Sequence, residues 1–348
     1  MKDMIKECVM NLKPYKVIED EYAIKLDANE SPYNIFENIG ELILAKLIPE
    51  PNRYPNNDST RLKKALAEYT KMGEENILCG NGSDELLKIV IDTFVSMGDF
   101  VVTHSPSFAM YKVMTQIAGG KLLEVEGDKT FSIDIDTIIS QANENNAKLI
   151  FLCTPNNPTG RVINRKDIIK VLDNTSSIVV VDEAYYEFHG ETVIDKINEY
   201  ERLIVLRTLS KAFGLAGLRI GYGVASKSMI EIISKVKPPY NLNTISQSIG
   251  EIVLDNREAV YKYIELIKSE RDRVVHELET INSIEVIPTK SNFVLIRTNK
   301  YDDLMKRFRR KKIKVKGFGI EGILGKCIRL TIGMESENMK VLQVLKDV

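Results

Sequence analysis

The chain has 348 residues, of which 44% are hydrophobic and 28% are charged. These values are ordinary for a soluble globular protein and exclude a disordered, collagen-like or coiled-coil chain, and at roughly 150 residues per domain the length predicts about two domains. The 48 basic and 49 acidic residues give a net charge of −1, so we expect neither nucleic acid nor an anionic membrane as the main partner.

From about residue 60 onward the hydrophobic pattern alternates between helix and strand. One helix is predicted after the candidate caps Asp58 and Ser59, a second begins at the candidate cap Ser83, and a long one covers about 256–278. Seven short apolar runs are predicted strands: 77–79, 100–103, 122–125, 149–153, 178–181, 203–206 and 219–224. Because several are continuously apolar and helices separate them, the pattern predicts an α/β domain with a mostly parallel seven-stranded sheet.

The C-terminal part has a different pattern. Its predicted strands are 284–287, 293–297, 313–316 and 327–332, with one helix near 301–311 and another at the end. This order predicts a smaller α+β domain. Residues 1–45 carry little regular pattern and are expected to pack against it as an arm. We therefore divide the chain into the arm 1–45, a large domain 46–260 and a small domain 261–348.

The four cysteines are scattered, without a C-x-x-C pair: Cys8, Cys79, Cys153 and Cys327. We expect reduced thiols in a cytoplasmic protein and, with only three histidines, no metal site. The segment 1–16 is charged and has no apolar core, so no signal peptide is expected. No uncharged apolar run approaches 18 residues, which predicts no membrane span.

Four segments contain candidate functional residues: GNGSDE at 80–85, TPNNPTG at 154–160, VVVDEAYYEF at 179–188 and TLSKAFGLAGLRIGYG at 208–223. In the last, Lys211 follows Ser210 in a glycine-rich loop, and Arg219 lies eight residues later. A lone lysine in such a loop is usually solvated. The combination of lysine, hydroxyl, glycines and arginine suits a Schiff-base lysine beside a phosphate clamp.

Asp182, Tyr185 and Asn157 are individually weak candidates. Asp182 ends a predicted parallel strand, where α/β proteins form their ligand crevice, although taken alone it is more simply explained as a helix cap. Tyr185 alone suits core packing, and Asn157 suits an ordinary turn. Their order and spacing along the chain are more informative than any one of them.

The segments SKAFGLAGLRIGY, NNPTG and DEAYYEF resemble those of the pyridoxal-phosphate-dependent aminotransferases of the aspartate aminotransferase fold, fold type I. DANESPY at 27–33, RYPNNDSTRLKKALAEY at 53–69 and CIRLTIG at 327–333 extend the resemblance over nearly the whole chain and are most similar to the branch acting on histidinol phosphate. The resemblance implies a homodimer that carries pyridoxal 5′-phosphate. It further implies amino transfer between glutamate/2-oxoglutarate and histidinol phosphate/imidazole acetol phosphate, a step of histidine biosynthesis.

The resemblance also implies a role for each matching residue around the cofactor ring. Lys211 would bond to the cofactor and, once released, move the proton of the substrate Cα. Asp182 would keep the pyridine nitrogen protonated, since a charge pair at ~4 Å is worth about 4 kcal/mol at an effective dielectric of 20. Asn157 and Tyr185 would hydrogen-bond the ring oxygen, and Phe108 would stack on the ring unless it is a core residue.

The cofactor phosphate requires donors, and a helix start supplies free N–H groups. By resemblance the donors are Gly82, Ser83, Asp84, Ser210 and Arg219, with Tyr54 reaching the same phosphate from the partner subunit. Arg329 would grip a substrate carboxylate with its planar fork, and Asn29 would border that site. The phosphate of histidinol phosphate would meet Tyr15 and Lys316, the latter replacing an arginine that is usual in the family.

Three alternatives remain open. Within the same fold, the protein is consistent with an aromatic or broad-specificity aminotransferase, or with a phospho-amino-acid decarboxylase. A DNA-binding regulator built on this scaffold would need an added module, for which the sequence before 80–85 leaves no room. The run 306–316 holds eight basic residues; we interpret it as a solvated surface rather than a nucleic-acid site.

Overall fold

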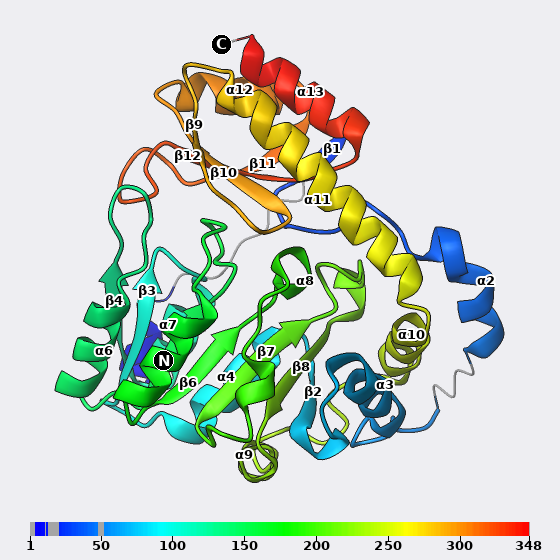
Figure 1. Ribbon diagram of the computed structural model, residues 1–348, viewed down its shortest axis with the longest axis vertical. Helices are drawn as coiled ribbons and strands as arrows, with labels where there is room; N and C mark the ends of the chain where they lie inside the picture. The colour runs from blue at the N-terminus through cyan, green and yellow to red at the C-terminus, as the bar shows by residue number, and fades with distance from the viewer. Residues whose placement is uncertain (1–3, 11, 13–20, 48–51, 348) are drawn as a thin grey trace.

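The computed structural model describes residues 4–10, 12, 21–47 and 52–347. Two sheets dominate it (Figure 1). A larger sheet forms the lower half of the view in Figure 1, and a smaller sheet lies above it, joined to it by a long helix.

The larger sheet has seven strands in the order β2-β8-β7-β6-β5-β3-β4. They are β2 (Ile77–Asn81), β3 (Phe100–Ser105), β4 (Lys121–Glu126), β5 (Leu149–Cys153), β6 (Ile178–Asp182), β7 (Leu203–Thr208) and β8 (Ile220–Ala225). Only β8 runs against the others. The predicted fold class, with a mostly parallel seven-stranded sheet, is confirmed.

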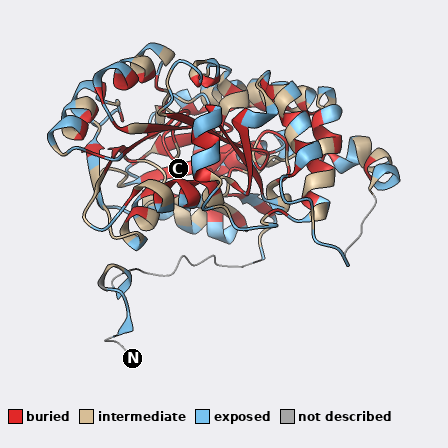
Figure 2. Cartoon of the chain, turned by 90° about the horizontal axis from the view of Figure 1, so that it is seen from below, coloured by how far each residue is buried: buried red, intermediate tan, exposed pale blue. Residues whose placement is uncertain are grey.

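Helices cover both faces of this sheet, which explains its continuously apolar strands. They are α3 (Thr60–Thr70), α4 (Ser83–Phe94), α5 (Met110–Ile117), α6 (Ile135–Glu144), α7 (Arg165–Asn174), α8 (Tyr186–His189), α9 (Lys227–Ile233) and α10 (Thr244–Asp255), with the short turns η2 (Glu74–Asn76), η3 (Ile194–Lys196) and η4 (Ala216–Leu218). Val179 and Val205 pack with α6 and α7, whereas Val180 and Ile204 pack with α4 and α9. Figure 2 shows the resulting buried centre in red. Both faces of β6 and β7 are therefore shielded from water, so a binding site on these strands can form only at their ends.

The smaller sheet has five strands in the order β1-β11-β12-β10-β9. They are β1 (Ile24–Leu26), β9 (Glu285–Ile287), β10 (Phe293–Arg297), β11 (Ile313–Gly317) and β12 (Cys327–Thr331), accompanied by α11 (Glu258–Glu279), α12 (Tyr301–Arg310) and α13 (Glu335–Lys346). The first strand comes from the N-terminal segment and pairs in parallel with β11. The smaller sheet is thus built from both ends of the chain.

The expectation of little regular structure in residues 1–45 was wrong for three segments: α1 (Glu7–Met10), β1 and α2 (Phe36–Lys46). The strand has only three residues, too few for alternation to be visible in the sequence. The backbone of α2 leaves helical geometry at Ile39, beside Gly40, and this interrupts the helical spacing of its apolar positions. Tertiary contacts rather than local pattern define these elements.

Both predicted helix caps were also wrong in detail. Ser59 precedes α3 with φ 51°, but its side chain makes no cap bond; instead Asn56 Oδ1 accepts from the backbone N–H of Thr60 at 3.1 Å. Ser83 is the first residue of α4, and Gly82 is its N-cap, so no side chain caps this helix. The N–H groups at the start of α4 are therefore not engaged by a capping side chain.

Among the described residues, no helix is long and apolar enough to cross a bilayer, and no cluster of three or more His, Cys, Asp or Glu side chains could hold a metal ion. The basic run 306–316 occupies the end of α12 and most of β11. Within it, Arg307 forms an i,i+4 ion pair with Asp303.

Candidate active site

A pocket of about 550 Å³, open to solvent, lies at the carboxyl ends of β5, β6 and β7. Each strand contributes a residue from its end: Cys153, Asp182 and Thr208. The other lining residues are Ser83, Asp84, Phe108, Asn157, Ala184, Tyr185, Ser210, Lys211 and Arg219. The four segments with candidate functional residues, far apart in sequence, thus meet in one place, as expected for the carboxyl edge of a parallel sheet.

Asp182 lines the pocket and is only 4% exposed. Tyr111 Oη donates to its Oδ2 at 2.6 Å, and the Ala184 N–H donates to Oδ1 at 3.1 Å. Burial raises the pKa of this carboxyl group to about 6, although both hydrogen bonds favour the ionised form. No basic side chain in the described part of the chain pairs with Asp182, and such a buried carboxylate is suited to pair with a cationic group of a ligand.

Tyr111 was not assigned a role from the sequence. Its ring is fully buried and stacks on Phe151 with centroids 4.7 Å apart. Phe108, which lines the pocket, meets the Tyr111 ring edge-on at 5.6 Å. The three-residue spacing of Phe108 and Tyr111 was a visible signal, but nothing in the sequence says that the hydroxyl reaches Asp182.

Lys211 projects into the pocket from the loop after β7, and its Nζ donates to the Ala28 carbonyl at 2.9 Å. Burial, together with the positive charges of Arg329 and Arg219, lowers the pKa of its ammonium group to about 8. A lysine with such a pKa is neutral in about one molecule in ten at pH 7, far more often than an ordinary lysine. Neutral amine is the form that attacks carbonyl groups and accepts protons.

The start of α4 and Arg219 form one end of the pocket, which is suited to bind an anion and which we call the cradle. The uncapped start of α4 faces Arg219, whose Nη2 lies 3.1 Å from Asp84 Oδ2. Gly82 has φ 79°, and a Cβ on Gly221 would lie 2.3 Å from the Gly82 carbonyl carbon. Only glycine at 221 lets β8 approach the loop this closely. Free N–H groups, the helix dipole and a guanidinium together suit a phosphate.

Two further lining residues, Asn157 and Tyr185, are held by residues from distant parts of the chain. Asn29, with φ 55°, donates from Nδ2 to Tyr185 Oη at 2.9 Å and is almost fully buried. Arg329 donates to Asn157 Oδ1 and to the Asp27 carbonyl. Asn29 and Arg329 therefore hold in place two residues that line the pocket, Tyr185 and Asn157.

Tyr54 and Lys316 are predicted site residues that do not line the pocket. Tyr54 is 80% exposed and stacks on Tyr240 with ring centroids 4.6 Å apart. Lys316 is exposed on β11, with its Nζ 5.9 Å from the centre of the Phe318 ring. Tyr15 lies outside the described residues.

The pocket fits the pyridoxal phosphate that the sequence resemblance implies. The cradle at α4 matches a phosphate, the buried Asp182 matches a pyridinium nitrogen, and Lys211 supplies an amine in the same pocket. A Cβ on Gly82 would lie 2.6 Å from Arg219 Nη2, so a side chain at 82 would enter the cradle. The donor set and the space agree with the chemistry of the group.

Comparison with known proteins gives the same result. The family model "Aminotransferase class I and II" matches residues 21–343. Curated proteins named histidinol-phosphate aminotransferase include one from Clostridium novyi, 40% identical over 99% of this chain and 97% of that protein, and one from Pyrococcus furiosus, 39% identical over 99% and 98%.

A solved structure also matches the fold. The crystal structure of histidinol-phosphate aminotransferase from Sinorhizobium meliloti in complex with pyridoxal-5′-phosphate superposes with a TM-score of 0.88, covering 99% of this chain and 97% of that chain at 22% identity. At this identity the match supports the fold alone. With the family model and the curated relatives, it establishes that the chain belongs to the pyridoxal-phosphate-dependent class I and II aminotransferases.

Proposed function

We propose that this enzyme transfers the amino group of L-histidinol phosphate to 2-oxoglutarate, giving imidazole acetol phosphate and L-glutamate in histidine biosynthesis. The observation that carries the proposal is about 40% identity along the whole chain to curated enzymes of that name. The smaller sheet supports it, because Lys314 and Lys316 lie on the same face of that sheet as Arg329.

When bound, pyridoxal phosphate supplies an electron sink that stabilises negative charge at the substrate Cα. The chain's own residues perform the remaining tasks. Lys211 Nζ, with its lowered pKa, would take the proton from the substrate Cα and deliver it to the cofactor. Asp182 would pair with the positive charge of the cofactor, and Tyr185 and Asn157, which line the same pocket, would orient its ring.

The substrate's phosphate is expected to meet β11. Lys316 lies directly opposite Arg329 in the antiparallel pair of β11 and β12, so their side chains leave the sheet on the same face. Lys314 shares that face, and its Nζ lies 3.5 Å from Asp27 Oδ2. Of the two lysines, Lys316 is the exposed one, so we assign to it the phosphate contact that an arginine makes elsewhere in the family.

Replacing Lys316 with alanine should reduce kcat/KM for histidinol phosphate. A charge-assisted contact to phosphate is worth about 1.5–3 kcal/mol, which corresponds to roughly 10- to 150-fold. The half-reaction with glutamate should stay nearly unchanged because glutamate has no phosphate. Lys316→Arg should preserve or improve the first reaction, and Lys306→Ala, which removes an exposed lysine on α12, is the control. Equal losses in both half-reactions of Lys316→Ala would make Lys316 structural.

We further propose a cytoplasmic homodimer in which Tyr54 completes the partner's phosphate cradle. The four cysteines are free, consistent with a reducing compartment. Tyr54 is mostly exposed and is not among the residues that line its own subunit's pocket. An exposed aromatic pair such as Tyr54 and Tyr240 is suited to burial against a second subunit.

Mixing two inactive variants tests this sharing of the site. Tyr54→Ala and Lys211→Ala subunits, once exchanged, should form hybrid dimers in which one site carries both defects and the other carries neither. Partial activity should then return in an assay of the mixture. If subunit exchange is demonstrated and Tyr54→Ala is itself inactive, an absence of recovery would assign Tyr54 to its own subunit.

The decarboxylase alternative predicts a different product. Purified enzyme should form glutamate from histidinol phosphate and 2-oxoglutarate in equal amounts with the oxo product, and should release no CO₂ from O-phospho-L-threonine. Release of CO₂ without any need for 2-oxoglutarate would replace the proposed transamination with decarboxylation.

A further inference from the structure

A second charged cluster lies behind the pocket, on the opposite face of the same two strands. Asp182 and Thr208 line the pocket, while their chain neighbours Glu183 and Arg207 point away from it, because successive side chains of a strand alternate between faces. Glu183 and Arg207 form an ion pair whose side chains are 1% and 3% exposed. Neither residue touches the pocket, and the reaction described above does not use them.

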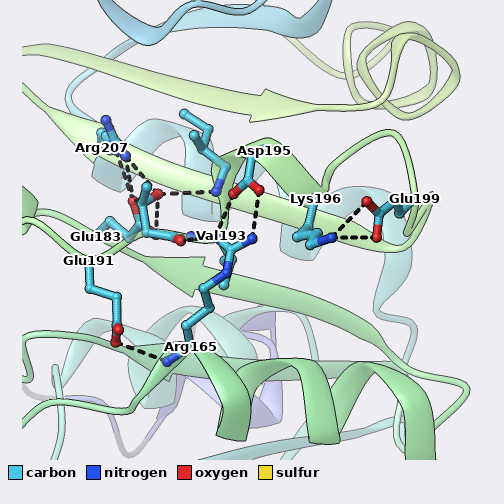
Figure 3. Close-up of polar contacts among 10 residues, drawn as sticks. Arg165, Glu183, Glu191, Val193, Asp195, Lys196, Glu199 and Arg207 are labelled. Atoms are coloured by element: carbon cyan, nitrogen blue, oxygen red, sulfur yellow. Dashed lines mark hydrogen bonds and ion pairs between the residues drawn. The ribbon is translucent and has the colours of Figure 1, made fainter.

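Hydrogen bonds and an ion pair connect the members of the cluster (Figure 3). Arg207 donates to Glu183 Oε2 from Nε at 2.9 Å, and its Nη2 lies 2.8 Å from the same oxygen. The other carboxylate oxygen, Oε1, accepts from Thr192 Oγ1 at 2.9 Å and from the Val193 N–H at 3.2 Å. Thr192 Oγ1 also accepts from Arg207 Nη2 at 2.8 Å. One hydroxyl thus bridges both partners.

The cluster also fixes the chain on either side of Tyr185. Upstream, Glu183 is held by the ion pair, and its N–H donates to the Leu206 carbonyl at 2.8 Å. Downstream, the Arg207 guanidinium lies 3.6 Å from the centre of the Tyr186 ring. Arg207 thus contacts the residue before the turn, Glu183, and the residue after Tyr185, Tyr186. A single side chain therefore fixes both ends of the turn that carries Tyr185 and follows Asp182.

A buried ion pair is weak evidence of stability, because replacing it with apolar side chains often leaves a protein equally stable. Such a pair is retained more readily where a unique geometry matters. We propose that the cluster of Glu183, Arg207, Thr192 and Tyr186 is a positioning unit that sets Asp182 and Tyr185 against the bound cofactor. Its members are positioning residues and contact neither substrate nor cofactor.

Thr192 offers the mildest test, because Thr192→Val keeps the shape and removes only the bridging hydroxyl. We expect the visible circular dichroism band of the holoenzyme to change, and kcat with the enzyme's best amino donor to fall on the order of 10-fold, within the ~100-fold that a 1 Å misplacement can cost. KM should change little. Thr192→Ser, which restores the hydroxyl, should recover both signals.

Arg165→Gln is the matched control. Arg165 contacts the same loop from outside, through the Thr192 carbonyl and Asp195, and Figure 3 shows this ion pair beside the buried one. Its loss should leave the dichroism band and kcat within about two-fold, because an ion pair that is largely open to water contributes little. If Arg165→Gln and Thr192→Val changed the dichroism band and kcat to a similar extent, any disturbance of the loop would explain the result. This outcome would overturn the proposal.

A purely structural role would lower the melting temperature of Thr192→Val and leave its dichroism band and kcat at wild-type values, and this result would also overturn the proposal. If Thr192→Val does not fold, Tyr186→Leu removes the stacking on Arg207 and leaves the ion pair intact, and the same two signals decide. The dichroism of bound cofactor needs no substrate. A failure of histidinol phosphate as donor would therefore leave this test unaffected.

Discussion

Lys211→Ala is expected to fold and to bind cofactor while losing at least about 1,000-fold in turnover, since it removes both the nucleophilic amine and the base that moves the Cα proton. The amine lies in the pocket with Asp182 and has a pKa lowered to about 8. Truncating it removes a hydrogen bond to the Ala28 carbonyl. The fold does not depend on that single contact, so the loss should be in catalysis rather than in stability.

Borohydride reduction checks the assignment directly, because it makes the bond between lysine and cofactor permanent. Peptide mapping should place the pyridoxyl label on Lys211. Lys227→Ala, which removes an exposed lysine at the start of α9, should behave as wild type in labelling and in turnover. A label on another lysine, or Lys211→Ala turnover within ten-fold of wild type, would remove Lys211 from the reaction.

The second large effect is expected for Asp182→Asn. The substitution keeps the size of the side chain and removes a charge that lines the pocket. At ~4 Å and an effective dielectric of 20, that charge is worth about 4 kcal/mol, or roughly 1,000-fold in rate if all of it acts in the transition state. Asp182→Asn should therefore bind cofactor and transaminate at least about 100-fold more slowly.

Tyr111→Phe is the matched control for Asp182. It removes one hydrogen bond to the carboxylate and leaves the charge in place, so turnover should fall by about 10-fold or less. Single-turnover absorbance measurements of both variants separate this chemistry from substrate binding. If Asp182→Asn retained turnover within a few-fold of wild type, the charge would not be part of the electron sink.

The core of the fold could be predicted because its signals are local. Runs such as 149–153 and 203–206 are apolar throughout, and each lies inside an observed strand, β5 and β7. Burial on both faces requires such runs. By contrast, β1 is defined by its pairing with β11, about 290 residues away in the chain, and nothing within three residues predicts that partner.

The candidate site, like the fold, was predictable from the sequence only in part. Lys211, Asp182, Asn157 and Arg219 came from motifs whose spacing is visible in the sequence, and the structure brings them into one pocket. The hydrogen bond from Tyr111 to Asp182 joins residues 71 positions apart. The ion pair of Glu183 and Arg207 depends on the register of β6 and β7, which brings both side chains to the face away from the pocket. Such contacts are consequences of strand register, which single-sequence patterns do not specify.

The proposed function depends most on the identity of the amino donor. Steady-state kcat/KM should be measured with 2-oxoglutarate as acceptor and with histidinol phosphate, phenylalanine and tyrosine as competing donors. The proposal predicts that histidinol phosphate exceeds both aromatic amino acids by at least about 10-fold, the lower limit expected for one charge-assisted phosphate contact. A higher kcat/KM with phenylalanine or tyrosine would contradict it and would identify a broad-specificity aminotransferase in which Lys316 is only a surface charge.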